Sequence, residues 1–175
     1  MLPARGRPGV HRRGHVHAAV GRVSEPVPLA RLLLLAHRQL VDGLHERLRT
    51  RGWTDVRESY GFVLLATRGA PTTTTDLAAL LGVSKQATSK LLDAMEASRY
   101  VERTADPGDA RMKVVALAPR GHELLAEVEQ IYAELEHEWA GTVGASQVEQ
   151  VRSSLTQVVL AGNDGVLPEV RPSVA

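Results

Sequence analysis

Residues 82–98 read GVSKQATSKLLDAMEAS, and this stretch decides the fold. Gly82 can adopt a positive φ, Val83 is apolar enough to fill the corner of a tight turn, and Ser84 can cap the helix that follows. Before the turn, residues 73–76 carry a capping pattern that opens a short helix ending at Gly82. Two short helices joined by such a turn are typical of a helix-turn-helix.

The second of these helices, from Lys85 to about Ser98, has two chemically different faces. The inward face is predicted from its apolar residues, which are Ala87, Leu91, Leu92 and Met95. The outer face carries the polar groups of the first two turns, on Lys85, Gln86, Thr88, Ser89 and Lys90. Amides and hydroxyls pair with base edges in a major groove, and lysines reach phosphates or guanine. The alternative is an ordinary solvated face, which Asp93 and Glu96 would suit, but the preceding turn favours DNA reading.

A β-hairpin is predicted next, from short strands at about 100–103 and 111–117 joined by a turn that contains Pro107 and Gly108. A hairpin in this place forms the wing of a winged helix-turn-helix. Arg111 stands where the wing can enter a minor groove, and Asp109 can hold its guanidinium or the loop amides. The alternative for this pair is a surface ion pair worth about 0 to 1 kcal/mol.

Apolar helices are predicted on both sides of this module. Leucine and alanine at three- and four-residue steps predict a helix at about 28–50, and a shorter one is indicated at about 55–68. Another begins at Pro119 and has an alternating apolar seam of Leu124, Val128, Ile131 and Leu135. Residues 146–149 have the form of a capping box before a last helix that ends at Gly162. Apolar stripes this long exceed what one small domain covers, so they predict a homodimer.

The ordered series of features in GVSKQATSKLLDAMEASRYVERTADPGDARMKVVALAPRGHELL, residues 82–125, resembles the MarR (multiple antibiotic resistance regulator) family. The series comprises the helix-turn-helix, the wing with its Asp-x-Arg, and a Leu-x-x-x-Gly start to the following helix. The likeness covers about residues 28–162. It implies a mainly α fold with a small β-hairpin wing, in which a winged helix-turn-helix at about 54–117 joins interlocking dimerisation helices at about 28–50 and 119–162.

The resemblance implies a transcription regulator that binds a pseudo-palindromic operator in double-stranded DNA as a homodimer, and specifically a repressor that a small-molecule effector releases. It places sequence recognition on Ser84, Lys85, Gln86, Thr88, Ser89 and Lys90. It assigns a minor-groove contact to Arg111, supported by Asp109, and a phosphate contact to Arg103. Ala118 departs from the family, which often has a capping Thr there.

Effectors of this family commonly bind between the dimerisation helices and the winged module. The candidates for effector contact here are His37, Trp53 and Tyr60, each of which could equally be an ordinary core or surface residue.

Composition is compatible with this interpretation without requiring it. Aromatic residues are only 3% of the chain, so the core must consist of Leu, Val and Ala, which favours helices. A net charge of +1 means that DNA contacts must come from locally placed cations. The chain has no cysteine, which excludes disulfides and thiolate metal sites and fits a cytoplasmic location. No apolar run approaches the ~20 residues that cross a bilayer, so no membrane partner is expected.

Three other classes of function have less support in the sequence. The chain lacks the nucleophile elbow, phosphate-binding loop and metalloprotease motifs, so neither an enzyme nor a cofactor is predicted. A metal-responsive regulator of the same fold is an alternative, with ligands drawn from His37, His45, His122, His137, Glu123 and Glu138, although none lies at His-x-x-x-His spacing. A winged protein-interaction module is the third, and the cationic start of the recognition helix argues against it.

Both ends of the chain are predicted to lie outside the folded domain. Residues 1–26 mix Arg with Gly, Pro and His without an apolar period and are predicted to be a disordered basic arm. Such an arm either tracks DNA phosphates or is a flexible extension without a specific role. Residues 163–175 are predicted to be a flexible tail.

Overall fold

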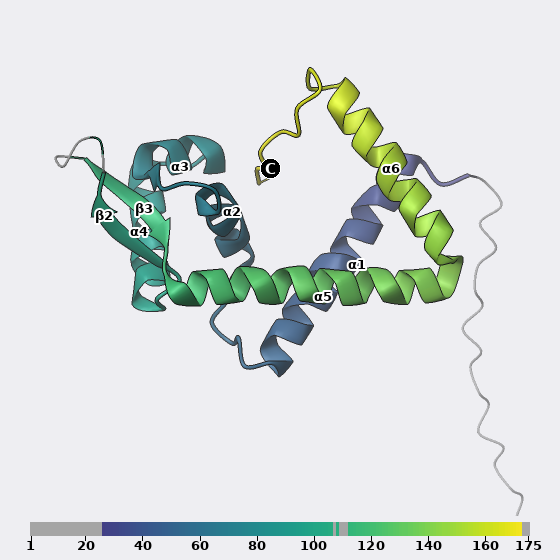
Figure 1. Ribbon diagram of the computed structural model, residues 1–175, viewed down its shortest axis with the longest axis horizontal. Coiled ribbons are helices and arrows are strands. Elements are labelled where there is room, and N and C mark those ends of the chain that lie inside the picture. The colour runs from purple at the N-terminus through teal and green to yellow at the C-terminus, as the bar shows by residue number, and fades with distance from the viewer. Residues whose placement is uncertain (1–25, 107, 109–111, 173–175) are drawn as a thin grey trace, which may run out of the picture.

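The computed structural model describes residues 26–106, 108 and 112–172 (Figure 1). The predicted basic arm therefore lies almost wholly outside the described residues, and so do Asp109 and Arg111 of the wing.

The described chain forms the predicted mainly α fold with a small wing. Its elements, in chain order, are α1 (Leu29–Thr50), α2 (Glu58–Thr67), β1 (Thr72–Thr73), α3 (Thr74–Leu81), α4 (Lys85–Ala97), β2 (Val101–Ala105), β3 (Lys113–Leu117), α5 (Pro119–Val143) and α6 (Ala145–Ala161). In the described ranges, no helix combines the length and hydropathy that crossing a bilayer requires.

Helix α5 is the long axis of the molecule in Figure 1, with the winged module at one end and α6 rising from the other. Helix α1 crosses α5 near its middle, where Gly43 permits a close approach: a Cβ there would lie 2.8 Å from a methyl group of Leu135. Beside this crossing, Arg51 pairs with Glu127 and Glu134, at 2.5 Å in both cases. The crossing thus combines an apolar contact with ion pairs at the end of α1.

The wing belongs to a three-stranded antiparallel sheet of order β1-β3-β2. Strands β2 and β3 pair over their whole length, with Arg103 opposite Val115, and the Asp106 amide extends the hairpin by donating to the Met112 carbonyl at 2.9 Å. The two-residue strand β1 was not predicted, because two threonines before a helix cap carry no alternating pattern.

One apolar core joins the winged module to α1 and α5. Its fully buried members include Leu48 of α1, Val63 of α2, Leu92 and Met95 of α4, Tyr100 before β2, and Leu124 and Ile131 of α5. Two aromatic rings are fully buried in it, those of Tyr60 and Tyr100, which meet edge to face at 5.9 Å. The apolar seam predicted for α5 therefore packs mainly within the chain, since three of its four residues are buried here.

The capping box predicted at residues 146–149 is wrong. Helix α6 begins at Ala145, so Ser146 lies inside its first turn, and its hydroxyl donates to the Gln147 side chain at 2.7 Å. Helix α5 runs to Val143, and Gly144 alone turns the chain, with φ 99°. A one-residue connection leaves no room for a separate capping residue.

Candidate nucleic-acid interface

The turn between α3 and α4 has the geometry expected from its residues. Thr73 caps α3 by accepting the Asp76 amide at 3.1 Å, and Gly82 ends that helix in the left-handed conformation, with φ 67°. Ser84 caps α4 by accepting the Ala87 amide at 3.2 Å. Val83 does not fill the corner, since it is 48% exposed. The turn nevertheless presents the first two turns of α4 at the surface.

The exposed start of α4 carries most of the predicted DNA-reading residues. Ser84, Lys85, Gln86 and Lys90 are exposed, and Ser89 is half-buried. Ala87 is also exposed, although it was predicted to point inward. Exposed methyl groups on DNA-binding helices can contact the methyl group of thymine. The surface thus offers amide, hydroxyl, ammonium and methyl groups within about two helical turns.

Thr88 was assigned to this surface, and that assignment is wrong. Its side chain is fully buried, on the face of α4 that also buries Leu92 and Met95. The Thr88 hydroxyl donates to the Ser84 carbonyl at 3.2 Å, so burial leaves no polar atom unpaired. Thr88 therefore anchors α4 in the core and presents no group to DNA.

Arg103 connects the wing to α4. Its guanidinium binds Glu96 at 2.5 Å and Asp93 at 2.8 Å, and it donates to the Ser89 carbonyl at 3.3 Å. Its side chain is only 23% exposed. Two carboxylates already neutralise this cation, so the predicted phosphate contact would have to compete with them. On the neighbouring strand, Lys113 is an exposed cation that the sequence analysis did not single out.

Asp55 joins the winged module to the start of α5. Its carboxylate accepts the Tyr100 hydroxyl at 2.6 Å and an Arg120 nitrogen at 3.2 Å. Arg120 also donates to the Ser98 carbonyl at 2.9 Å and stacks on the Tyr100 ring, 4.7 Å from its centre. These contacts fix the loop after α1 and the corner before β2 against the first turn of α5.

The same contacts shift two pKa values in opposite directions. Burial alone would raise the pKa of the Asp55 carboxyl, but hydrogen bonds from Tyr100 and Ser98, helped by a nearby guanidinium, outweigh it and hold that pKa below its usual value. Burial and the hydrogen bond to Asp55 raise the pKa of the Tyr100 hydroxyl well above its usual range. The carboxylate is therefore ionised and the phenol protonated at neutral pH.

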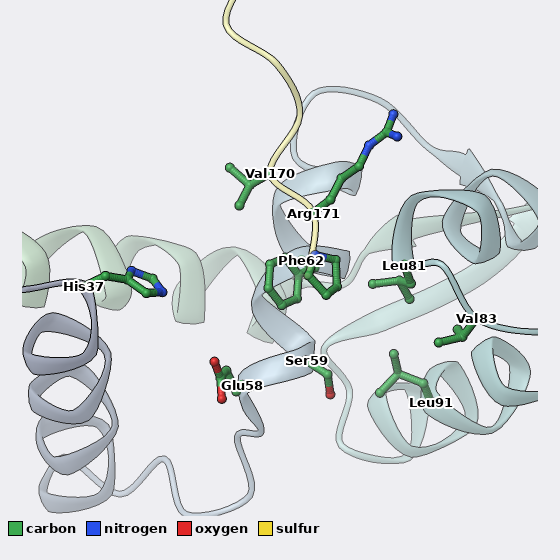
Figure 2. Close-up of a pocket in the computed structure, with 10 residues that line it drawn as sticks. His37, Glu58, Ser59, Phe62, Leu81, Val83, Leu91, Val170 and Arg171 are labelled. Atoms are coloured by element: carbon green, nitrogen blue, oxygen red, sulfur yellow. The ribbon is translucent and has the colours of Figure 1, made fainter. Parts of the chain in front are cut away.

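An apolar cavity of about 320 Å³ lies between α1, α2 and α5, and a groove of about 530 Å³ adjoins it beside the winged module. They share His37, Glu58, Phe62 and Val170 (Figure 2). The cavity wall is mostly aliphatic and aromatic, with Val41, Leu44, Leu125, Val128 and Tyr132 among its residues. The space fits a small apolar molecule.

Of the three predicted effector contacts, only His37 lines this space. Tyr60 is 2% exposed and packs in the core, and Trp53 packs on Tyr100 with the Arg120 guanidinium 5.4 Å from its ring centre. Trp53 and Tyr60 are therefore wrong as cavity residues, because packing inside the winged module takes up both rings. Phe62 and Tyr132 are the cavity aromatics that sequence reasoning missed.

The possible metal ligands are scattered. Among the residues that the structure describes, no three His, Cys, Asp or Glu side chains come together in a way that could hold a metal ion.

Comparison with known proteins agrees with this geometry. A family model described as MarR family matches residues 54–112, from the loop before α2 to the tip of the wing. The reduced form of MarR from E. coli superposes with a TM-score of 0.64 at 26% identity, covering 77% of this chain and 98% of that one. Residues 54–112, which include the whole helix-turn-helix, belong to the MarR family. No curated protein sequence matches the chain.

Other solved structures show the same fold at lower identity. The transcriptional regulator Tm0710 from Thermotoga maritima has a TM-score of 0.63 at 22% identity, covering 79% of this chain and 98% of that one. A mutant of MepR from S. aureus, bound to an oligodeoxyribonucleotide, has a TM-score of 0.55 at 21% identity, covering 78% and 99%. The likeness in fold to these structures thus extends beyond the residues that the family model matches.

Proposed function

We propose that this MarR-family chain is a homodimeric repressor that binds a pseudo-palindromic operator in duplex DNA and is released by a small apolar effector. The observation that carries the proposal is the exposed polar start of α4, where Lys85, Gln86 and Lys90 lie free of the core on a helix held by a capped turn. A helix presented in this way enters a major groove N-terminus first. The structurally similar MepR mutant bound to an oligodeoxyribonucleotide supports DNA as the partner.

Within this proposal, the recognition residues are Ser84, Lys85, Gln86, Ser89 and Lys90, with Ala87 added and Thr88 withdrawn. Arg111 reaches the minor groove and Asp109 supports it, although neither belongs to the described residues. Arg103 positions the wing against α4 through Asp93 and Glu96, in place of a phosphate contact.

The homodimer is supported by apolar side chains that one chain leaves uncovered. On α1 these are Leu29, Leu32, Leu33, Leu34 and Leu35, which expose 39–67% of their surface. On α6 they are Val151, Leu155, Val158 and Val159, which expose 37–70% and form one stripe at three- and four-residue steps. Monomeric proteins rarely leave contiguous apolar patches of this kind in water. A second copy of the chain is the partner that covers them with two-fold symmetry.

The effector site is the cavity between α1, α2 and α5, because it lies where the dimerisation helices meet the winged module. A ligand there contacts both parts and can change their relative orientation, which sets the spacing of the two recognition helices.

Replacing Gln86 with Ala is expected to weaken operator binding by about 1 to 3 kcal/mol and to relax base preference at one position in each half-site, because a side-chain amide pairs with base edges. Competition binding to randomised duplexes measures both effects. Thr88→Ser is the control: its hydroxyl remains buried, so base preference should stay unchanged. The DNA-reading role of α4 fails if Gln86→Ala changes neither affinity nor preference while circular dichroism shows intact helices.

Replacing Arg111 with Ala is expected to weaken binding to many sequences, most of all those with narrow A·T-rich flanks, and to reduce the slope of log affinity against log salt by about 1 per chain. The loss of one cation from the minor groove releases fewer counterions. Arg152→Ala is the comparator, because that cation of α6 is paired with Glu136 and Glu149 outside the winged module and its loss should leave the salt slope unchanged. If wild type and Arg111→Ala have equal slopes of log affinity against log salt, Arg111 does not contact the DNA.

A further inference from the structure

The C-terminal segment returns from the far end of α6 to the winged module (Figure 1). Residues 170–172 lie over the groove described above, and Figure 2 shows this stretch of chain passing directly beside Phe62. Val170 lines both the groove and the adjoining cavity. The other apolar residues of the groove wall come from α2, α3, the turn and α4, and they are Phe62, Leu81, Val83 and Leu91. A segment of the chain thus lies at the mouth of the proposed effector site.

The reversal that brings the segment back is a hydrogen-bonded turn. After α6, the Gly165 amide donates to the Leu160 carbonyl at 2.9 Å, and the Val166 amide donates to the Asn163 carbonyl at 2.9 Å. Asp164 and Gly165 both adopt positive φ, at 51° and 79°. Backbone geometry of this kind ends a helix and redirects the chain. The direction of the segment is therefore set locally, before it meets the groove.

The segment is stiff and only lightly packed. Pro168 and Pro172 fix their own φ and favour extended backbone at the preceding residues, so little conformational freedom is lost on docking. Val166, Leu167 and Val170 nevertheless remain 59–67% exposed. In Figure 2 the Arg171 guanidinium points away from Glu58, so the contact rests on apolar surface alone. Because most of the apolar surface of the segment stays exposed, a ligand can easily displace the segment from the groove.

We propose that residues 166–172 are a built-in competitor for the effector site, which an apolar ligand must displace before it can bind. The inference rests on the proposed function for the identity of the cavity. The short connection from α6 gives the segment an effective concentration on the order of millimolar at the groove. The segment then stays docked in the groove even if its contact there is weak. A docked segment lowers the apparent affinity of a competing ligand by a modest factor. The segment thereby sets the ligand concentration at which the regulator responds.

The test compares the full chain with a variant that ends at Leu167, using 1-anilinonaphthalene-8-sulfonate, a fluorescent anion whose aromatic rings bind apolar surface. Truncation is expected to tighten probe binding about three- to tenfold, because the tethered competitor is gone. Val170→Asn in the full chain should have the same effect, because it removes the apolar contact without adding a charge that repels the sulfonate, and it keeps the test valid if the truncated chain folds poorly. Glu169→Gln is the matched control, since Glu169 lines neither space and probe affinity should not change.

A second variant shows where the probe binds. Gly61 lines the cavity from α2, and a Cβ added there meets no atom within 4 Å, so Gly61→Leu fills the cavity from a helix that tolerates it. In the truncated chain, Gly61→Leu should abolish the gain in affinity. A gain that survives Gly61→Leu, equal probe affinity with and without the segment, or weaker binding after truncation each overturns the proposal.

Operator binding is measured on the same proteins without the probe. If the full chain binds no DNA but truncation still tightens probe binding, the proposed function fails and the competitor stands. If DNA is bound and truncation leaves probe affinity unchanged, the competitor alone fails.

Discussion

The double substitution Leu155→Asp with Val158→Asp is expected to convert the dimer into monomers and to abolish operator binding at micromolar protein. Burying a Val or Leu side chain is worth about 1.5 to 3 kcal/mol, and a two-fold interface carries each substitution twice. The four lost contacts amount to at least about 6 kcal/mol, or roughly four orders of magnitude in the dissociation constant of the dimer. Desolvating the new carboxylates adds to this loss. Light scattering reports the mass, and a DNA mobility shift reports operator binding.

The monomer itself should remain folded, because both side chains are exposed in the single chain. Ser153→Asp with Gln157→Asp is the matched control: it adds the same two charges to the opposite face of α6, and it should preserve both the dimer and DNA binding. Footprinting of the control and the wild type should then show two protected half-sites about 34 to 36 Å apart. A dimer that tolerates carboxylates on the apolar stripe of α6 would disprove this interface.

Replacing Gly121 with Ala is expected to destabilise the chain by about 3 kcal/mol, the upper part of the range for overpacking. A Cβ at Gly121 would lie 3.1 Å from the Tyr100 carbonyl carbon and far closer to its oxygen. That oxygen accepts the Ala118 amide at 3.1 Å, and the Tyr100 ring is held by Asp55 and Arg120. The backbone therefore has nowhere to move without breaking the joint between α5 and the winged module.

Gly141→Ala in the same helix is the control. An added Cβ there meets no atom within 4 Å, so the substitution is expected to stabilise the chain by about 0.5 to 1 kcal/mol through helix propensity. Urea denaturation of both variants gives the comparison, at one chain concentration because the stability of the proposed dimer depends on it. Similar stabilities for the two variants would show that the first turn of α5 does not require glycine.

The recognition helix shows how far sequence reasoning reaches. Its start at Lys85, its cap on Ser84 and its left-handed glycine at position 82 were predicted correctly, because each depends on residues within one turn. The face that it buries was predicted one residue off: Ala87 was expected inside, and Thr88 is buried instead. An apolar face through Leu91 and Leu92 continues backward equally well to Ala87 or to Thr88, and apolar character favoured Ala87. The structure buries Thr88 because the Ser84 carbonyl satisfies its hydroxyl.

The effector candidates show a different limit. Trp53 and Tyr60 are aromatic residues near the predicted boundary between helices and winged module, but their rings pack around Tyr100, 40 or more residues away in sequence. Phe62, two residues from Tyr60, faces the cavity instead. Helix α2 is apolar on nearly every side, so its sequence pattern does not indicate which face a cavity will meet.

The sequence by itself determined the helices, the caps of α3 and α4, the turn, the wing hairpin and the family that the winged module resembles. These features follow from helical and strand periods and from hydrogen bonds between near neighbours, which a linear pattern records. Only the tertiary structure decided that Arg103 forms ion pairs with Asp93 and Glu96. The same holds for the hydrogen bonds of Asp55 with Tyr100 and Arg120, and for the return of residues 170–172 to the groove. Each of these contacts joins elements whose relative placement depends on how the whole core packs, and no local period encodes that placement.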